Sequence, residues 1–280
     1  MAVAMVAKSS VKTDYIIPET KTYMKIAISG KGGVGKTLLA SLLARTFATS
    51  GYSVIAIDAD PDANLAATLG FPDAEEVTPI SEMKELIEER TETKPSQAGL
   101  YFKINPRVDD IPDKYSLKHD GIRLLVMGAV KKGGSGCYCP ENALLAALMA
   151  HLLIARDEVV ILDMAAGIEH LGRGTARAVD KLIIVVEPGR GSIETAHRID
   201  KLAQDIGLKN VAVVGNKVHS QMEMDFITSG LKGFEFLGFI PYDPAMVQAE
   251  IDNRPLLEAS QGITSAVKGI YHKLTSTGAS

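Results

Sequence analysis

A glycine-rich segment from Gly30 to Thr37 constrains the fold of this chain more than any other feature. It reads G-K-G-G-V-G-K-T and lies between an apolar run, Lys25 to Ser29, and leucines at helical spacing that begin at Leu38. Glycines let backbone N–H groups turn inward around an oxyanion, and the N-terminus of a following helix adds partial positive charge. A phosphate-binding loop needs this strand before it and this helix after it. The segment therefore predicts a nucleotide phosphate site in an α/β protein.

Two side chains of the loop carry specific expectations. Lys36 is placed to reach the outer phosphates, and Thr37 is placed to ligate magnesium. We expect the residues that follow Lys31 to bind the nucleotide phosphates. They are Gly32, Gly33, Val34, Gly35, Lys36, Thr37 and Leu38.

Apolar strand-like runs alternate with helical patterns along the rest of the chain. Most of these runs are continuously apolar, as strands covered on both faces must be. The alternation predicts an α/β fold, with a mostly parallel twisted sheet and helices on both faces. The expected strands are Lys25 to Ser29, Ser53 to Asp58, Ile122 to Met127, Val159 to Asp163, Lys181 to Glu187, Val211 to Gly215 and Glu235 to Ile240.

The pattern indicates one domain over residues 24–280, preceded by a loose extension at residues 1–23. Two segments interrupt it. Residues 73–120 are rich in Glu, Pro and Lys, with one helix expected near Ile80 to Arg90, and are interpreted as an insertion over the edge of the nucleotide site. Residues 128–140 form a glycine-rich loop that carries both cysteines of the chain.

Composition narrows the class of protein and its partners. A net charge of -4 and a pI near 5.9 argue against nucleic acid as a partner. The longest apolar run, Ala143 to Ala155, is shorter than the roughly 20 residues of a membrane span, so no membrane association is expected. The apolar stretch from Met1 to Ala7 precedes the first positive charge, which is the wrong order for a secretory signal. We therefore expect a cytoplasmic protein.

The phosphate loop carries an extra lysine, Lys31, in its second position. Lys31 to Thr37 resembles the deviant Walker A motif of the P-loop ATPases that include nitrogenase iron proteins, septum-site MinD proteins and plasmid-partition ATPases. The resemblance implies a homodimer that binds ATP or ADP. It also implies that Lys31 crosses the dimer interface to the partner's nucleotide, where it neutralises charge on the transferred phosphoryl group.

Two aspartate-rich motifs resemble the switch segments of the same family. In Asp58-Ala59-Asp60-Pro61-Asp62-Ala63-Asn64, the resemblance makes Asp60 the residue that positions the attacking water and Asn64 a contact of magnesium-bound water. Asp163-Met164-Ala165-Ala166-Gly167 resembles the second switch and places Asp163 near magnesium. The expected catalytic residues are thus Lys31, Lys36 and Asp60, and the expected magnesium set is Thr37, Asp60, Asn64 and Asp163.

The segment Asn216-Lys217-Val218-His219 resembles the start of a guanine-reading motif, but a histidine replaces the aspartate that would bind guanine. Adenine is therefore favoured. The amide of Asn216 offers both a donor and an acceptor to the base edge, Lys217 is expected at the nucleotide, and family resemblance places Pro241 and Tyr242 against the ring.

Cys137 and Cys139 flank a single tyrosine. One chain supplies two thiolates, whereas a closed site for a zinc-like ion takes four ligands. The two-fold axis of the family's dimer would bring four sulfurs together. Thiolates bind Ni²⁺ or Zn²⁺. A redox pair and incidental loop thiols remain alternatives for these residues.

Lys131 to Pro140, together with Glu169 to Thr175, resembles the CooC family of nickel-inserting ATPases of carbon monoxide dehydrogenase maturation. The resemblance implies a dimeric ATPase that holds nickel and delivers it to carbon monoxide dehydrogenase. Acetyl-CoA synthase is an alternative client. A MinD- or ParA-like positioning ATPase is a further alternative, which would use a basic amphipathic C-terminal helix. The apolar stripe of that segment is better explained by core packing; it consists of Ile263, Val267, Ile270, Tyr271 and Leu274.

Overall fold

One eight-stranded sheet organises the computed structural model, which describes residues 23–93, 102–128, 139–168, 171–252 and 256–276. Its strand order is β3-β4-β2-β5-β1-β6-β7-β8. All neighbouring strands are parallel except β3, which pairs with β4 in antiparallel fashion. The strands are β1 (Lys25–Gly30), β2 (Val54–Ala59), β3 (Leu117–His119), β4 (Ile122–Val126), β5 (Val159–Met164), β6 (Lys181–Val186), β7 (Val211–Val218) and β8 (Glu235–Pro241).

Helices cover both faces of this sheet because alternate strand residues point to opposite sides. In β1, Ala27 belongs to one buried apolar cluster, whereas Ile26 and Ile28 belong to the other. The Ala27 side is covered by α3 (Lys84–Thr91), α4 (Ile111–Tyr115), α5 (Pro140–Ile154), α6 (Arg173–Ala176), α7 (Arg190–Asp205) and α8 (Gln221–Gly230). The opposite side is covered by α1 (Lys36–Thr49), α2 (Leu65–Thr68), α9 (Pro244–Ile251), α10 (Leu256–Ala259) and α11 (Gln261–Ser276).

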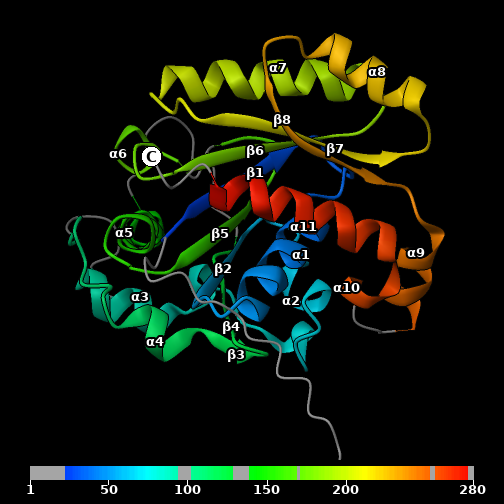
Figure 1. The fold of residues 1–280 in the computed structure, drawn as a ribbon. Helices are drawn as coiled ribbons and strands as arrows, with labels where there is room; N and C mark the ends of the chain where they lie inside the picture. The colour runs from blue at the N-terminus through cyan, green and yellow to red at the C-terminus, as the bar shows by residue number, and fades with distance from the viewer. Residues whose placement is uncertain (1–22, 94–101, 129–138, 169–170, 253–255, 277–280) are drawn as a thin grey trace, which may run out of the picture.

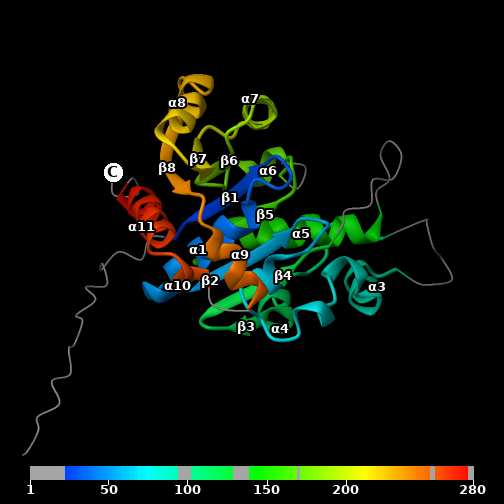
Figure 2. The same ribbon diagram turned by 90° about the vertical axis from the view of Figure 1, so that its right-hand side faces the viewer.

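The two ends of the sheet carry different helices. Figures 1 and 2 show α7 and α8 together above β6, β7 and β8, whereas β3 and α4 lie at the opposite end. The apolar stripe of α11 is buried against β8 and α1, with Val267 and Ile270 fully inaccessible to solvent. This confirms the interpretation of the stripe as core packing. Among the described residues, no helix is both long and apolar enough to cross a membrane.

The predicted α/β class is confirmed, and each of the expected strands is present with bounds that differ by three residues or fewer. The segment 73–120 is more structured than the sequence indicated. Besides α3 it contains two 3-10 turns, Ala74–Glu76 and Ile80–Glu82, as well as α4 and β3. The segment packs α3 against α5 and extends the sheet at β3, with three strands between β3 and β1. Its main described contacts are therefore with α5 on one face of the sheet and with β4.

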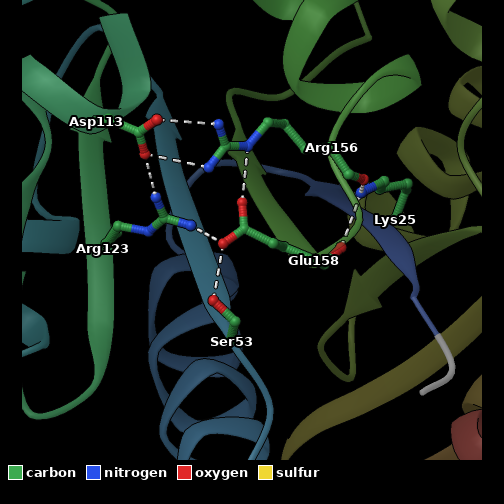
Figure 3. Close-up of polar contacts among 6 residues, drawn as sticks. All are labelled: Lys25, Ser53, Asp113, Arg123, Arg156 and Glu158. Carbon is green, nitrogen blue, oxygen red and sulfur yellow. Dashed lines mark hydrogen bonds and ion pairs between the residues drawn. The ribbon is translucent and has the colours of Figure 1, made fainter. Parts of the chain in front are cut away.

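A polar cluster ties this segment to the amino-terminal ends of the strands (Figure 3). The Glu158 carboxylate accepts hydrogen bonds from Ser53 Oγ at 2.7 Å and Arg156 Nε at 2.8 Å, and it also pairs with Arg123. Both arginines reach Asp113 on α4. Because Glu158 is only 11% exposed, its charge depends on these partners. The cluster holds together the amino-terminal ends of the strands, on the side of the sheet opposite to the nucleotide loop.

Candidate functional site

The carboxyl ends of β1, β2, β5, β6 and β7 meet along one edge of the sheet, where parallel α/β folds bind ligands. The loop after β1 leads into α1, as the sequence predicts for a phosphate site. Gly33 has φ of 79° and Gly35 has φ of 93°, a left-handed conformation that glycine adopts without strain. Val34 between them is fully buried and anchors the loop, while Gly32 and Gly33 are exposed.

Lys36 is the first residue of α1 and is 7% exposed. Its ammonium group lies 3.9 Å from Asp60 Oδ2, which belongs to the loop after β2 and is 21% exposed. At this separation the two charges attract without a close hydrogen bond, so the ammonium group retains donors for phosphate oxygens. The structure thus brings together two of the expected catalytic residues.

Asp58, at the end of β2, organises the loop that carries Asp60. Its carboxylate accepts the Leu65 N–H at 2.9 Å and the Asp60 N–H at 3.2 Å. Burial raises the pKa of Asp58 to about 6, partly offset by these two hydrogen bonds. Sequence reasoning did not single out Asp58 as a site residue. The feature that could have identified it is an aspartate in an otherwise apolar strand.

Asp163 pairs in register with Ile28 on β1 and with Asp58 on β2, so it lies directly beside the phosphate loop strand. Its side chain is fully buried, and neither carboxylate oxygen has a hydrogen-bond partner among the described residues. Burial raises its pKa to about 7, and the nearby Asp58 charge acts in the same direction. The Thr37 hydroxyl is near enough to favour the charged form, although its geometry falls short of a hydrogen bond.

These oxygens fit a hard cation. Magnesium takes oxygen ligands and commonly binds through one or two carboxylates, waters and nucleotide phosphates. The unpartnered Asp163 carboxylate and the Thr37 hydroxyl at the start of α1 supply such oxygens beside the phosphate loop. Asn64 is exposed at the N-terminus of α2, in the same loop as Asp60. The donor set therefore fits magnesium.

Ser29, the residue before the phosphate loop, holds the segment after β5. Its hydroxyl lies 3.1 Å from the Ala165 carbonyl and 2.8 Å from the Gly167 carbonyl, and it is fully buried. These hydrogen bonds connect the residue before the phosphate loop to the second switch segment. Sequence reasoning missed this role because a serine at a strand end carries no specific signal.

Lys31 is exposed on the phosphate loop, and its side chain lies near the start of α7. Its ammonium group is 3.5 Å from the position that a Cβ on Gly191 would take. A surface hollow forms there between the loop, Ala166 of the second switch segment and α7. Besides these residues it is lined by Glu194, Thr195, Arg198, Ile199 and Leu202.

The expected base-binding residues lie at the ends of β7 and β8. The Asn216 side chain donates to the Val34 carbonyl at 2.7 Å, and the Lys217 ammonium donates to the Gly33 carbonyl at 2.6 Å. Pro241 ends β8, and the following Tyr242 is 46% exposed. The Tyr242 ring stacks on His219 with centroids 4.6 Å apart. The structure thus joins the predicted segment at the end of β7 to the phosphate loop and stacks Tyr242 against the same segment.

The cysteine motif lies at the start of α5. Cys139 directly precedes the helix and is half-buried, whereas Cys137 lies outside the described residues. Within the described part of the chain, no three His, Cys, Asp or Glu side chains gather as a metal site. The helix begins at Pro140, which shortens the predicted cysteine loop by one residue.

Comparison with known proteins places this site in a family. Residues 25–256 match the model of the CobQ/CobB/MinD/ParA nucleotide binding domain. The chain is 50% identical over 230 residues to the carbon monoxide dehydrogenase accessory protein CooC of Rhodospirillum rubrum, covering 81% of this chain and 87% of that protein. The chain is a CooC-type ATPase of the MinD/ParA family. It is also 50% identical over 236 residues to an ATP-binding protein of Methanocaldococcus jannaschii, covering 83% of this chain and 91% of that protein.

Solved structures support the same fold. The MinD cell division protein of Aquifex aeolicus, in its complex with MinC, matches with a TM-score of 0.67 at 23% identity and covers 90% of this chain and 96% of its own. A plasmid partition protein of Borrelia burgdorferi bound to AMPPNP matches with a TM-score of 0.65, covering 91% of this chain and 100% of its own. At these identities the likeness concerns the fold alone. CooC-type membership and the family domain together establish ATP hydrolysis as the activity.

Proposed function

We propose that this ATPase is a dimeric maturation factor that binds nickel and inserts it into carbon monoxide dehydrogenase. The observation that carries this proposal is the Cys137-Tyr138-Cys139 motif in a chain 50% identical to the CooC accessory protein of Rhodospirillum rubrum. ATP hydrolysis alone is common to the whole family. A pair of thiolates within the nucleotide-binding domain adds a means of holding a soft metal ion.

The nucleotide chemistry is assigned to the loop and switch residues. Lys36 binds the outer phosphates, and Asp60 positions the attacking water while lying 3.9 Å from Lys36. Thr37, Asp60, Asn64 and Asp163 hold magnesium directly or through its waters. When bound with the nucleotide, magnesium draws negative charge from the phosphate oxygens. The unpartnered Asp163 carboxylate supports this assignment.

The dimer is assigned to the face that carries Lys31. This side chain lies in a surface hollow beside α7 on its own chain. For catalysis it leaves this hollow and reaches the partner's nucleotide, where its positive charge meets the developing phosphoryl charge. ATP binding thereby stabilises the dimer, and hydrolysis weakens it.

The metal site is assigned to Cys137 and Cys139 of both chains. Two copies related by a two-fold axis supply four sulfurs. Four thiolates with no bound water accept zinc in a tetrahedron, while nickel thiolates also adopt a square plane. Nickel is the cargo in this proposal, and zinc substitutes for it. Because Cys139 directly precedes α5, the metal lies at the end of a helix anchored in the core.

Metal titration followed by native mass measurement tests this assignment. The proposal predicts one Ni²⁺ or Zn²⁺ per dimer, and it predicts loss of that metal in Cys137→Ser and in Cys139→Ser. Since dimerisation builds the site, a dimer-stabilising ATP analogue should raise metal affinity, and the metal should raise affinity for the analogue by the same factor. One metal per monomer, or undiminished binding in either variant, would overturn the bridged site.

A further inference from the structure

Two side chains at the end of β7 are bonded to the phosphate loop. Asn216 Nδ2 lies 2.7 Å from the Val34 carbonyl oxygen, and Lys217 Nζ lies 2.6 Å from the Gly33 carbonyl oxygen. The two carbonyls are consecutive. The end of one strand therefore forms hydrogen bonds to two adjacent peptide units of the loop.

These two hydrogen bonds fix the direction in which the N–H groups of the loop point. In a planar trans peptide the C=O and N–H bonds point in opposite directions. Holding the Val34 carbonyl against Asn216 thus turns the Gly35 N–H away from β7, toward the cradle at the start of α1. Holding the Gly33 carbonyl against Lys217 likewise turns the Val34 N–H away from β7, and this N–H donates to the Lys31 carbonyl at 3.4 Å, which closes the loop on itself. Inward N–H groups are what a phosphate loop needs.

The surroundings show that the contact is a close one. Asn216 is 2% exposed, and a Cβ built on Gly35 would collide with its amide nitrogen. Lys217 has φ of 56°, a left-handed conformation that is strained for a lysine and persists only where surrounding contacts hold it. Its ammonium group also lies 3.8 Å from Glu187 at the end of β6. Three strand ends thus meet at this point.

We propose that Asn216 and Lys217 are positioning residues that preorganise the phosphate loop, so that their contribution to ATP binding reaches the phosphates without involving the base. This proposal concerns the ATP site alone. It stands or falls separately from nickel delivery and from the cysteine site.

A ligand without a base separates loop positioning from base reading. Magnesium tripolyphosphate carries the phosphate chain of ATP and no adenosine. We would measure its affinity and that of magnesium ATP in Asn216→Ala and Lys217→Met, by competition with a fluorescent ADP analogue. Tyr242→Ala is the matched comparison, because its ring stacks on His219 at the same rim, and among the described residues no hydrogen bond joins its side chain to the loop.

We expect each of the first two variants to lose about tenfold in affinity for both ligands, as for one hydrogen bond to a phosphate-ordering carbonyl. Tyr242→Ala should leave tripolyphosphate binding unchanged. Amide hydrogen exchange of residues 33–35 in the nucleotide-free protein should be faster in Asn216→Ala than in the wild type. Lys217→Arg, which keeps a donor, should restore part of the loss.

Two results would overturn the proposal. Weakened ATP binding with wild-type tripolyphosphate binding would mean that Asn216 and Lys217 read the base. Wild-type affinity for both ligands would mean that the two hydrogen bonds do not position the loop. If Asn216→Ala does not fold, Lys217→Met decides, since that side chain is 43% exposed and its removal leaves no buried cavity.

Discussion

Replacing Asp163 with asparagine should stabilise the nucleotide-free protein and abolish its magnesium-dependent ATP hydrolysis. The carboxylate is fully buried, and neither of its oxygens has a hydrogen-bond partner in the described part of the chain. Without magnesium, its negative charge is thus held in the interior with little compensation. Asparagine has the same shape and no charge, so it removes this cost together with the cation ligand.

The size of the effect follows from the pKa. Burial, as the largest cause, raises the pKa of Asp163 from 3.8 to about 7. Between these values the folded state binds more protons than the unfolded state, so this carboxyl lowers stability as pH rises from about 4 to about 7. With about 1.4 kcal/mol per pKa unit, the full cost above pH 7 is about 4 kcal/mol. We expect Asp163→Asn to recover about 2–4 kcal/mol at pH 8, since the asparagine amide also needs partners.

Urea unfolding in EDTA, without nucleotide, measures this directly at pH 8 and pH 5. At pH 5 the folded wild-type carboxyl is protonated, whereas the unfolded one is still ionised. The gain of the variant should therefore be smaller than at pH 8 by about 3 kcal/mol, which is about 1.4 kcal/mol for each of the two pH units below 7. Asp205→Asn, on an exposed residue of α7, is the control and should change little at either pH. A variant that is no more stable than wild type at pH 8, or whose gain is the same at both values of pH, would refute the reasoning.

Three further predictions concern other parts of the chain. Lys36→Ala should abolish nucleotide binding, whereas Lys31→Ala should spare binding and reduce turnover and dimerisation; normal turnover in Lys31→Ala would exclude the contact across the interface. ATP should bind better than GTP by about 1–3 kcal/mol, because His219 stands where guanine needs an aspartate, and equal affinities in a competition titration would contradict this. Glu158→Ala should cost about 1–3 kcal/mol in urea unfolding, because it removes the less exposed of the two carboxylates that pair with the half-buried Arg123 and Arg156, with a smaller loss in Asp113→Ala, whose carboxylate is 58% exposed.

The parallel core of the fold could be predicted because its strands are short apolar runs between helical patterns. Such runs, like Val159 to Asp163, have few alternative structures once both faces are covered. The short edge strand β3 could not be predicted in this way. It spans only Leu117–His119 and carries a lysine and a histidine, and its place depends on antiparallel pairing with β4. Its formation is a tertiary effect that local sequence does not encode.

The phosphate loop could be predicted because every one of its positions has a chemical requirement. The contacts that support the loop could not be predicted. Ser29 and Asp58 act through backbone groups of distant segments, and such bonds leave no spacing pattern in the sequence. For Asn216 the sequence predicted contact with the base and gave no sign of the bond to the Val34 carbonyl, 182 positions away, that the structure shows. Which partner a buried amide takes depends on how β7 and β1 come together in space.

Reactivation of nickel-free carbon monoxide dehydrogenase tests the central claim most directly. The client enzyme would be incubated with limiting Ni²⁺, magnesium ATP and this protein, and its activity followed over time. Rapid activation with the wild type is predicted, together with none above the nickel-only rate for Lys36→Ala, for Cys137→Ser or with a non-hydrolysable ATP analogue. Equal activation by the Cys137→Ser variant, or activation that does not depend on ATP, would contradict ATP-driven nickel delivery through the cysteine pair.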